Sequence, residues 1–219
     1  LDLSFGEGRI RTDLLASGSL PVARGELHAD YAAQTAQLRL EKLALDLHGG
    51  TTLGIEGQLG GLSPQLVSTG GPLPSSLHGA LAVTLAHVPT TRIAALWPRG
   101  VSPGGRKWAV ANLSDGMLDE MTAQLGVTVD PQAMTADFSD AHAVMLYHDM
   151  TVDYFTGLPP AKKVGGTATL TGRRLDFAIA GGAVKSLKAT GGTVSITNIG
   201  PGTETLTVDV GVSGALQDE

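Results

Sequence analysis

The sequence predicts an all-β fold with one short helix, in which an elongated, twisted antiparallel sheet forms an open groove. Apolar and polar residues alternate over many segments of about ten residues, and such alternation is typical of half-buried antiparallel strands. The chain has 30 glycines and only 4% aromatic residues, although apolar residues make up 42% of it. Small aliphatic side chains must therefore supply most of the buried surface, which favours thin layers of sheet over one thick core.

The alternating segments give the expected strands and the side chains expected to line the groove. Segment 37–47 changes parity at Glu41 and Lys42, which predicts a β-bulge or a tight turn. Residues 116–130 fit a helical or a two-residue period, and the β-branched residues 127–129 favour a strand. The expected lining set is aliphatic apart from one phenylalanine: Leu43, Leu45, Leu47, Leu53, Ile55, Leu81, Val83, Leu85, Leu125, Val127, Val144, Leu146, Leu175, Phe177, Ile179, Val194, Ile196, Leu206, Val208 and Val210.

One short helix is expected over residues 89–98. Thr90 or Thr91 can cap its first turn, and Trp97 falls on its apolar side. Pro98 ends the helix because proline disfavours the helical conformation in the residue before it.

The two tryptophans flank a turn rich in proline and glycine. We expect Trp97 to pack the short helix onto the sheet and Trp108 to begin the next strand, so that the pair acts as a structural staple. The basic residues between them, Arg99, Arg106 and Lys107, are expected to remain solvated.

The whole chain, residues 1–219, is expected to be a single segment of a longer β-groove protein. It begins at Leu1 rather than at a methionine, and strand-like alternation continues almost to its end. The loop 62–76, rich in proline, glycine and serine, is the possible internal boundary. Gly-Gly-Thr recurs from residues 49, 165 and 191, which suggests repeated strand–turn–strand units.

Composition excludes several classes of function. The net charge of −6 and the lack of a basic stripe argue against nucleic-acid binding, because phosphate neutralisation requires clustered lysine and arginine. The chain has no cysteine, which excludes disulfides, thiolate chemistry and cysteine-type zinc sites. No segment approaches the ~18 uninterrupted apolar residues that a membrane-spanning helix requires.

No catalytic or metal-binding constellation stands out, and we expect no cofactor. His142 and His148 would lie about 20 Å apart on a strand, too far to share a metal ion. The sequence has no nucleophile elbow and no phosphate-binding loop. Its neighbouring carboxylates, such as Asp119 and Glu120, have opposite parity and would not converge as a glycosidase pair must.

The remaining feature is the long aliphatic stripe, for which three interpretations stay open. The stripe can hold the alkyl chains of lipids in a curved, non-catalytic sheet. It can instead be the dry interior of a structural or adhesive β-solenoid or β-sandwich that binds a protein partner. The third interpretation is a hydrolase built on a β-scaffold.

Three segments carry distinctive patterns. Residues 25–61 have a strand rhythm of repeated Gly-x-Leu and Leu-x-Leu steps. Residues 87–120 have an expected short helix ending in Trp-Pro, followed by a turn and a second tryptophan. Residues 151–184 have a Tyr…Leu-Pro segment followed by a glycine-headed hairpin. In these patterns the sequence resembles the AsmA-like superfamily of Gram-negative envelope proteins, in particular its YhdP/TamB-like branch.

The resemblance implies a periplasmic segment of a protein anchored in the inner membrane, which carries phospholipids towards the outer membrane. Its expected partners are phospholipid acyl chains and neighbouring groove segments of the same parent chain. Contact with membranes is expected only through the ends of the parent protein. The family has no catalytic residues to carry over.

Overall fold

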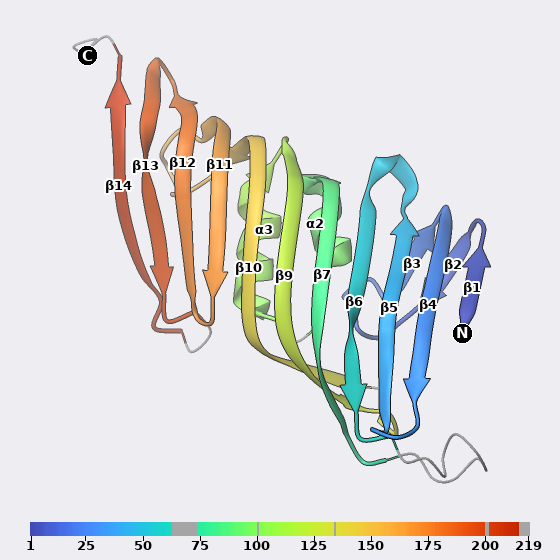
Figure 1. The fold of residues 1–219 in the computed structure, drawn as a ribbon. Coiled ribbons are helices and arrows are strands. Elements are labelled where there is room, and N and C mark those ends of the chain that lie inside the picture. Colours follow the sequence, from blue (N-terminus) through green and yellow to red (C-terminus); the bar gives the residue numbers. More distant parts are fainter. Residues whose placement is uncertain (63–73, 100, 134, 200–201, 215–219) are drawn as a thin grey trace. The chain divides into compact units, whose positions relative to one another are not determined.

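The computed structural model of the chain is mostly β, with a large, open, twisted antiparallel sheet of 12 strands and two short α-helices (Figure 1). It describes residues 1–62, 74–99, 101–133, 135–199 and 202–214. The strand order is β1-β4-β5-β6-β7-β9-β10-β11-β12-β13-β14, with β8 paired to β10, and β2 and β3 form a separate two-stranded sheet. The predicted fold class is confirmed, although one short helix was predicted and the described residues contain two α-helices.

The first seven strands and one 3₁₀ turn occupy residues 2–89. Their bounds are β1 (Asp2–Phe5), β2 (Gly8–Arg11), β3 (Ser19–Val22), β4 (Arg24–Ala32), β5 (Gln37–Asp46), η1 (His48–Gly50), β6 (Thr52–Gly60) and β7 (Leu77–Pro89).

Two helices follow, and the remaining strands come after them. Their bounds are α2 (Thr90–Leu96), α3 (Pro103–Asn112), β8 (Leu113–Ser114), β9 (Met117–Asp130), β10 (Thr135–Val152), β11 (Ala161–Thr171), β12 (Arg174–Val184), β13 (Leu187–Thr197) and β14 (Thr205–Ser213). None of the helices in the described ranges has the length and apolarity needed to cross a membrane.

The chain forms two compact units. The N-terminal unit comprises Leu1–Ala86, Pro98–Val101 and Thr122–His142, and the C-terminal unit comprises His87–Trp97, Ser102–Met121 and Ala143–Glu219. Most of the loop that the sequence offered as a boundary, residues 63–73 of 62–76, lies outside the described residues. Leu62 and Pro74 at its two ends both belong to the N-terminal unit.

The predicted bulge in β5 is confirmed. The pairing of β5 with β6 shifts register between Leu40 and Leu43, the position where the sequence changes parity. One extra residue in a strand reverses its alternation, so Leu40 and Leu43 project from the same face. The later Gly-Gly repeats also mark bulges, because the register of β11 shifts at Gly165 and that of β13 shifts before Gly191.

The predicted short helix is confirmed as α2, whereas the prediction for Trp108 is wrong. Trp108 lies in α3 and is 43% exposed, so it does not begin a strand. The missed signal is Pro103, since proline is favoured at the first position of a helix, where its missing N–H costs nothing. Trp97 directly follows α2, and its ring approaches Gly105 of α3.

Pro98 and Arg99 are held by the loop between β2 and β3. Pro98 forms an isolated β-bridge with Leu15, and the backbone N–H of Arg99 donates to the carbonyl of Leu14 at 2.7 Å. The Nε of Arg99 donates to the carbonyl of Leu15 at 3.0 Å. Arg99 therefore binds the β2–β3 loop, and its side chain remains exposed, as the sequence predicted.

Each unit has a small buried core. The N-terminal unit buries Leu20, Val22, Leu45, Leu47, Thr51, Leu77 and Val127. The C-terminal unit buries Val88, Thr90, Ala109, Leu118, Ala143, Tyr147, Met150, Val164 and Ala168. Most other aliphatic residues of the strands are half-buried or exposed, as expected for a sheet that is not fully covered.

We predict that Gly79→Ala destabilises the fold by about 1–3 kcal/mol, as expected for overpacking. A Cβ at Gly79 would lie only 1.8 Å from the backbone oxygen of Gln58 in the neighbouring strand, so the β6–β7 pairing must distort. Gly60→Ala in the same strand pair is the matched control, since its added Cβ would meet nothing closer than 3.8 Å. Chemical denaturation should show a lower midpoint for the Gly79 variant alone. Equal midpoints for the two variants would contradict the described register.

Candidate functional site

In the N-terminal unit, the register of β1, β4, β5, β6 and β7 gathers apolar side chains on one face. Directly paired residues in antiparallel strands project from the same face, as do alternate residues along a strand. Leu43 pairs with Ile55, which in turn pairs with Val83. This N-terminal aliphatic face holds Leu3, Phe5, Leu27, Leu38, Leu40, Leu43, Leu45, Leu53, Ile55, Leu59, Leu81, Val83 and Leu85.

The C-terminal unit has a second face of the same kind, formed by β11, β12, β13 and β14. Its members pair in three successive rows, so it is continuous across the four strands. The rows of this C-terminal aliphatic face are Leu170–Leu175–Ile196–Leu206, Ala168–Phe177–Val194–Val208 and Gly166–Ile179–Gly192–Val210.

These two faces contain most of the residues predicted to line a groove. The N-terminal face includes Leu43, Leu45, Leu53, Ile55, Leu81, Val83 and Leu85, and the C-terminal face includes Leu175, Phe177, Ile179, Val194, Ile196, Leu206, Val208 and Val210. Leu47 directly follows β5 and is buried.

Leu125 and Val127 also have the parity of the N-terminal aliphatic face. The hydroxyl of Thr128 lies 3.1 Å from Nδ1 of His78. His78 pairs with Gly60 on the polar side of the sheet, so Thr128 projects from that side too. Val127 and Leu125 consequently project from the opposite side, and Val127 is buried.

Val144 and Leu146 do not project from the same side as the other predicted lining residues, so their assignment to the groove lining is wrong. Both are exposed, while the alternate residues Ala143 and Tyr147 are buried. The Tyr147 ring contacts Phe177 edge-on at a centroid distance of 6.3 Å, which assigns Tyr147 to the side of the C-terminal aliphatic face.

Two irregular residues in β10 explain the error. Asp140 and Asp149 have positive φ angles of 48° and 54°. The half-buried positions change from even to odd numbers at Asp140 and return to even numbers at Asp149. A single-residue bulge reverses which side chains face each side, and aspartate tolerates the left-handed conformation better than most residues.

The aliphatic faces are partly open to solvent. Along β14, Leu206 and Val208 are 61% and 59% exposed, and most residues of the N-terminal aliphatic face are only half-buried. Among the described residues, the only other sheet is the β2–β3 pair. Contiguous exposed apolar surface of this kind is uncommon on a monomer and typically marks a binding surface.

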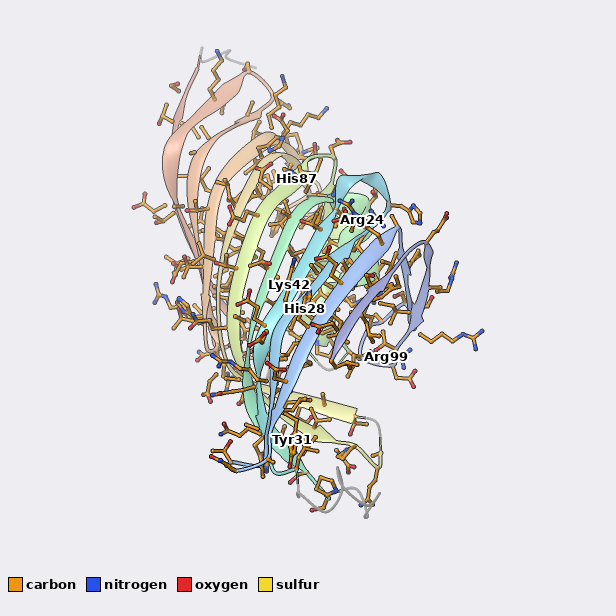
Figure 2. All side chains as sticks on the ribbon, turned by 45° about the vertical axis from the view of Figure 1, so that its right-hand side comes forward. Arg24, His28, Tyr31, Lys42, His87 and Arg99 are labelled. Carbon is orange, nitrogen blue, oxygen red and sulfur yellow. The ribbon has the colours of Figure 1, made fainter. Side chains whose placement is uncertain are left out.

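The opposite face of β1, β4 and β5 is charged. Oδ1 of Asp2 lies 2.6 Å from Nδ1 of His28, and Oε2 of Glu26 lies 2.7 Å from Nζ of Lys42. Arg24 forms an ion pair with Asp46. Figure 2 shows Arg24, His28 and Lys42 along this face. The hydrogen bond from Lys42 holds the pKa of Glu26 below its usual value. Lys42 also borders a depression of about 300 Å³ whose lining includes the small residues Ala44, Gly54 and Ala82.

The polar face of the C-terminal unit is similarly paired. Asp176 accepts hydrogen bonds of 2.6 Å from both Arg174 and Ser195, and these bonds, with that from Arg174 first, lower the pKa of Asp176. Arg174 and Asp176 therefore neutralise each other.

The described residues contain no cluster of three or more His, Asp or Glu side chains suited to a metal ion. His148 is paired instead with a single carboxylate, since its Nδ1 lies 2.7 Å from Oδ2 of Asp119. That hydrogen bond raises the pKa of His148.

Sequence patterns did not identify Tyr147, which lies on the side of the C-terminal aliphatic face. Burial raises the pKa of Tyr147 to about 12, and within the described part of the chain its hydroxyl oxygen has no hydrogen-bond partner. The sequence signal for Tyr147 is weak. Tyr147 alternates with Val144 and Leu146, which look like the apolar side of the strand unless the bulge is known.

Comparisons with protein families, with curated proteins and with solved structures find no match to this chain.

We predict that His148 titrates above its ordinary pKa of about 6.5 and that Asp119→Asn removes most of the increase. A raised folded-state pKa stabilises the fold at pH values below the unfolded-state pKa, and this contribution is lost as the pH rises through the folded-state pKa. NMR titration of the His148 ring measures the shift directly. Asp149→Asn is the matched control, because Asp149 acts on His148 only through a weaker charge interaction and should change the pKa less. An equal effect of the two variants would contradict the hydrogen-bonded pair.

Proposed function

We propose that this chain binds lipid acyl chains on its aliphatic faces without catalysing a reaction, as a segment of a lipid-transfer protein. The observation that carries the proposal is the pairing register of β11 to β14, which aligns three rows of small apolar side chains on one partly open face. A methylene group removed from water contributes about 0.8 kcal/mol, so contact along several residues gives useful affinity without polar recognition.

The composition of the faces fits alkyl chains better than shaped ligands. Among the paired residues of the two faces, nearly all are Leu, Ile, Val, Ala or Gly. Such side chains form a smooth surface with few donors or acceptors, whereas pockets for drug-sized ligands combine apolar walls with a few well-placed polar groups. A flexible hydrocarbon chain requires only continuous apolar contact.

The division of charge supports the same interpretation. In the N-terminal unit, the ion pairs of Arg24, His28 and Lys42 all lie on the face opposite the aliphatic residues. One side of these strands can therefore remain hydrated while the other holds lipid.

The alternatives account for fewer of these features. A β-sandwich would place a second sheet over the aliphatic face, and the described residues contain only the small β2–β3 sheet beside the main one. A hydrolase would need converging catalytic groups, and the ion pairs found here join one base to one acid at separate places.

The resemblance to AsmA-like envelope proteins supplies a setting for the proposal. The proposal includes a periplasmic location in a Gram-negative cell and a parent protein anchored in the inner membrane. It also includes transport of phospholipid towards the outer membrane. The strands themselves would then bind the transported lipid, and neighbouring segments of the parent chain would extend the binding surface.

We predict that Val208→Asp sharply reduces the phospholipid that co-purifies with the chain from the envelope of a Gram-negative host. An unpaired charge on an apolar binding surface costs on the order of a few kcal/mol, and Val208 is exposed enough for the variant to fold. Native mass spectrometry followed by organic extraction measures the bound lipid.

Thr207→Asp is the matched control for that experiment. Thr207 is the preceding residue in β14, is also exposed, and projects from the opposite face because it pairs with Ser195. The proposal expects this variant to retain its lipid. A wild-type chain that is consistently free of lipid, or equal loss in both variants, would contradict binding on the aliphatic face.

A further inference from the structure

A second exposed apolar surface lies outside the aliphatic faces, where the loop that follows β10 starts beside the end of α3. It consists of Trp108 on α3 with Tyr154, Phe155 and Leu158 in the loop, and is called the loop–helix patch below. All four side chains are exposed, and Phe155 is 65% exposed. This small surface holds three of the chain's nine aromatic residues, counted as two Trp, three Tyr and four Phe.

Two hydrogen bonds bring the start of this loop to the end of the helix that carries Trp108, within the C-terminal unit. The backbone N–H of Asp153, the first residue after β10, donates to the carbonyl of Asn112 at 2.8 Å. Asn112 ends α3, and its side-chain amide donates to the carbonyl of Trp108 at 2.8 Å, one helical turn earlier. The loop therefore begins beside the last turn of the helix that carries Trp108.

A tight turn then presents Phe155 and Leu158 together. The N–H of Leu158 donates to the carbonyl of Phe155 at 3.1 Å, and Gly157 between them has a φ of 88°. A four-residue turn with its third residue at positive φ is a type II turn, which favours glycine there. The first and fourth residues of such a turn lie within about 7 Å of each other, so the two apolar side chains occupy its two ends.

Exposed lysines border the patch. Lys107 precedes Trp108 on α3, and Lys162 and Lys163 follow the loop at the start of β11. Because β10 and β11 are neighbours in the sheet, the two ends of the loop lie about 5 Å apart, which brings Lys162 and Lys163 back towards Asp153. The acidic residues near these lysines include Asp149, Asp153 and Asp115, and the Asp115 carboxylate accepts a hydrogen bond from Thr151.

We infer that the loop–helix patch docks the chain onto the surface of a bilayer that contains anionic phospholipid. Tryptophan and tyrosine favour the membrane–water interface, where their rings reach the acyl boundary and their polar atoms stay hydrated. Lysines around such a group add attraction to anionic headgroups. A local group of three lysines stands out on a chain whose net charge is −6.

The inference goes beyond the proposed function, because it concerns a different surface and would hold even if the aliphatic faces carried no lipid. It also differs from the expectation that membranes are contacted only through the ends of a parent protein. An internal docking point would hold an aliphatic face close to a bilayer while lipid enters or leaves.

The test is flotation of the purified chain with vesicles of phosphatidylethanolamine and phosphatidylglycerol, compared with vesicles of phosphatidylcholine alone. The wild-type chain should float with the anionic vesicles. Phe155→Ser combined with Leu158→Ser should weaken that binding by about tenfold or more, because it removes two side chains of buried hydrocarbon. Lys162→Gln and Lys163→Gln should each weaken it about fivefold at low salt and less at high salt.

Val144→Ser combined with Leu146→Ser is the matched control, since these residues are also exposed and apolar but lie along β10. It should float as the wild type does, and circular dichroism checks that every variant is folded. In a Trp97→Phe background, Trp108 is the sole tryptophan, and its emission should shift to shorter wavelength when anionic vesicles are added.

Three results would overturn the inference: no flotation of the wild-type chain, equal flotation of the Phe155/Leu158 variant, or an unchanged Trp108 emission in bound protein. Self-association that is lost in the Phe155/Leu158 variant, without flotation of the wild type, would assign the patch to a protein partner instead. The Val208→Asp variant separates the two proposals, because it should lose extracted lipid and still float.

Discussion

The structure depends on the parity of its strands. In an antiparallel sheet the hydrogen-bond register decides which side chains share a face, and a slip of one residue transfers a whole strand from one side to the other. The three rows of the C-terminal aliphatic face exist only because β11, β12, β13 and β14 keep a common register over that stretch. In β10, the longest strand, bulges at Asp140 and Asp149 keep the half-buried side apolar. Strict alternation would instead place polar residues among the aliphatic ones.

The same constraint explains what the sequence could predict. The bulge in β5 was visible because leucines occupy one parity before it and the other parity after it. In β10 the residues from Ala143 to Leu146 are all apolar, so neither parity stands out and Val144 and Leu146 were assigned to the wrong face. The α3 helix was missed because Pro103-Gly104-Gly105 has the composition of a turn, and a helix of ten residues that buries only Ala109 leaves little periodic signal.

The aromatic contact between Tyr147 and Phe177 shows how tertiary position modifies a residue that the sequence pattern alone does not single out. Tyr147 and Phe177 lie on different strands, and their rings meet edge-on, an arrangement that aromatic pairs favour. Burial raises the pKa of Tyr147 from about 10 to about 12, because the charged form would lose its hydration. Aromatic residues are therefore few in this chain, but one pair joins two strands of the C-terminal unit by a direct side-chain contact.

An open aliphatic face has a physical cost that a closed core avoids. Each Å² of apolar surface left in water forgoes about 25 cal/mol of stabilisation, and Leu206 and Val208 are more than half exposed on the last described strand. The sheet offsets part of this cost through the backbone hydrogen bonds of its 12 strands and through charges confined to the other side of β4 and β5. A binding hydrocarbon would recover the remainder, since it supplies the apolar cover that the chain does not supply itself. Stability and binding would then draw on the same side chains, and a substitution on the exposed end of the face would affect binding more than folding.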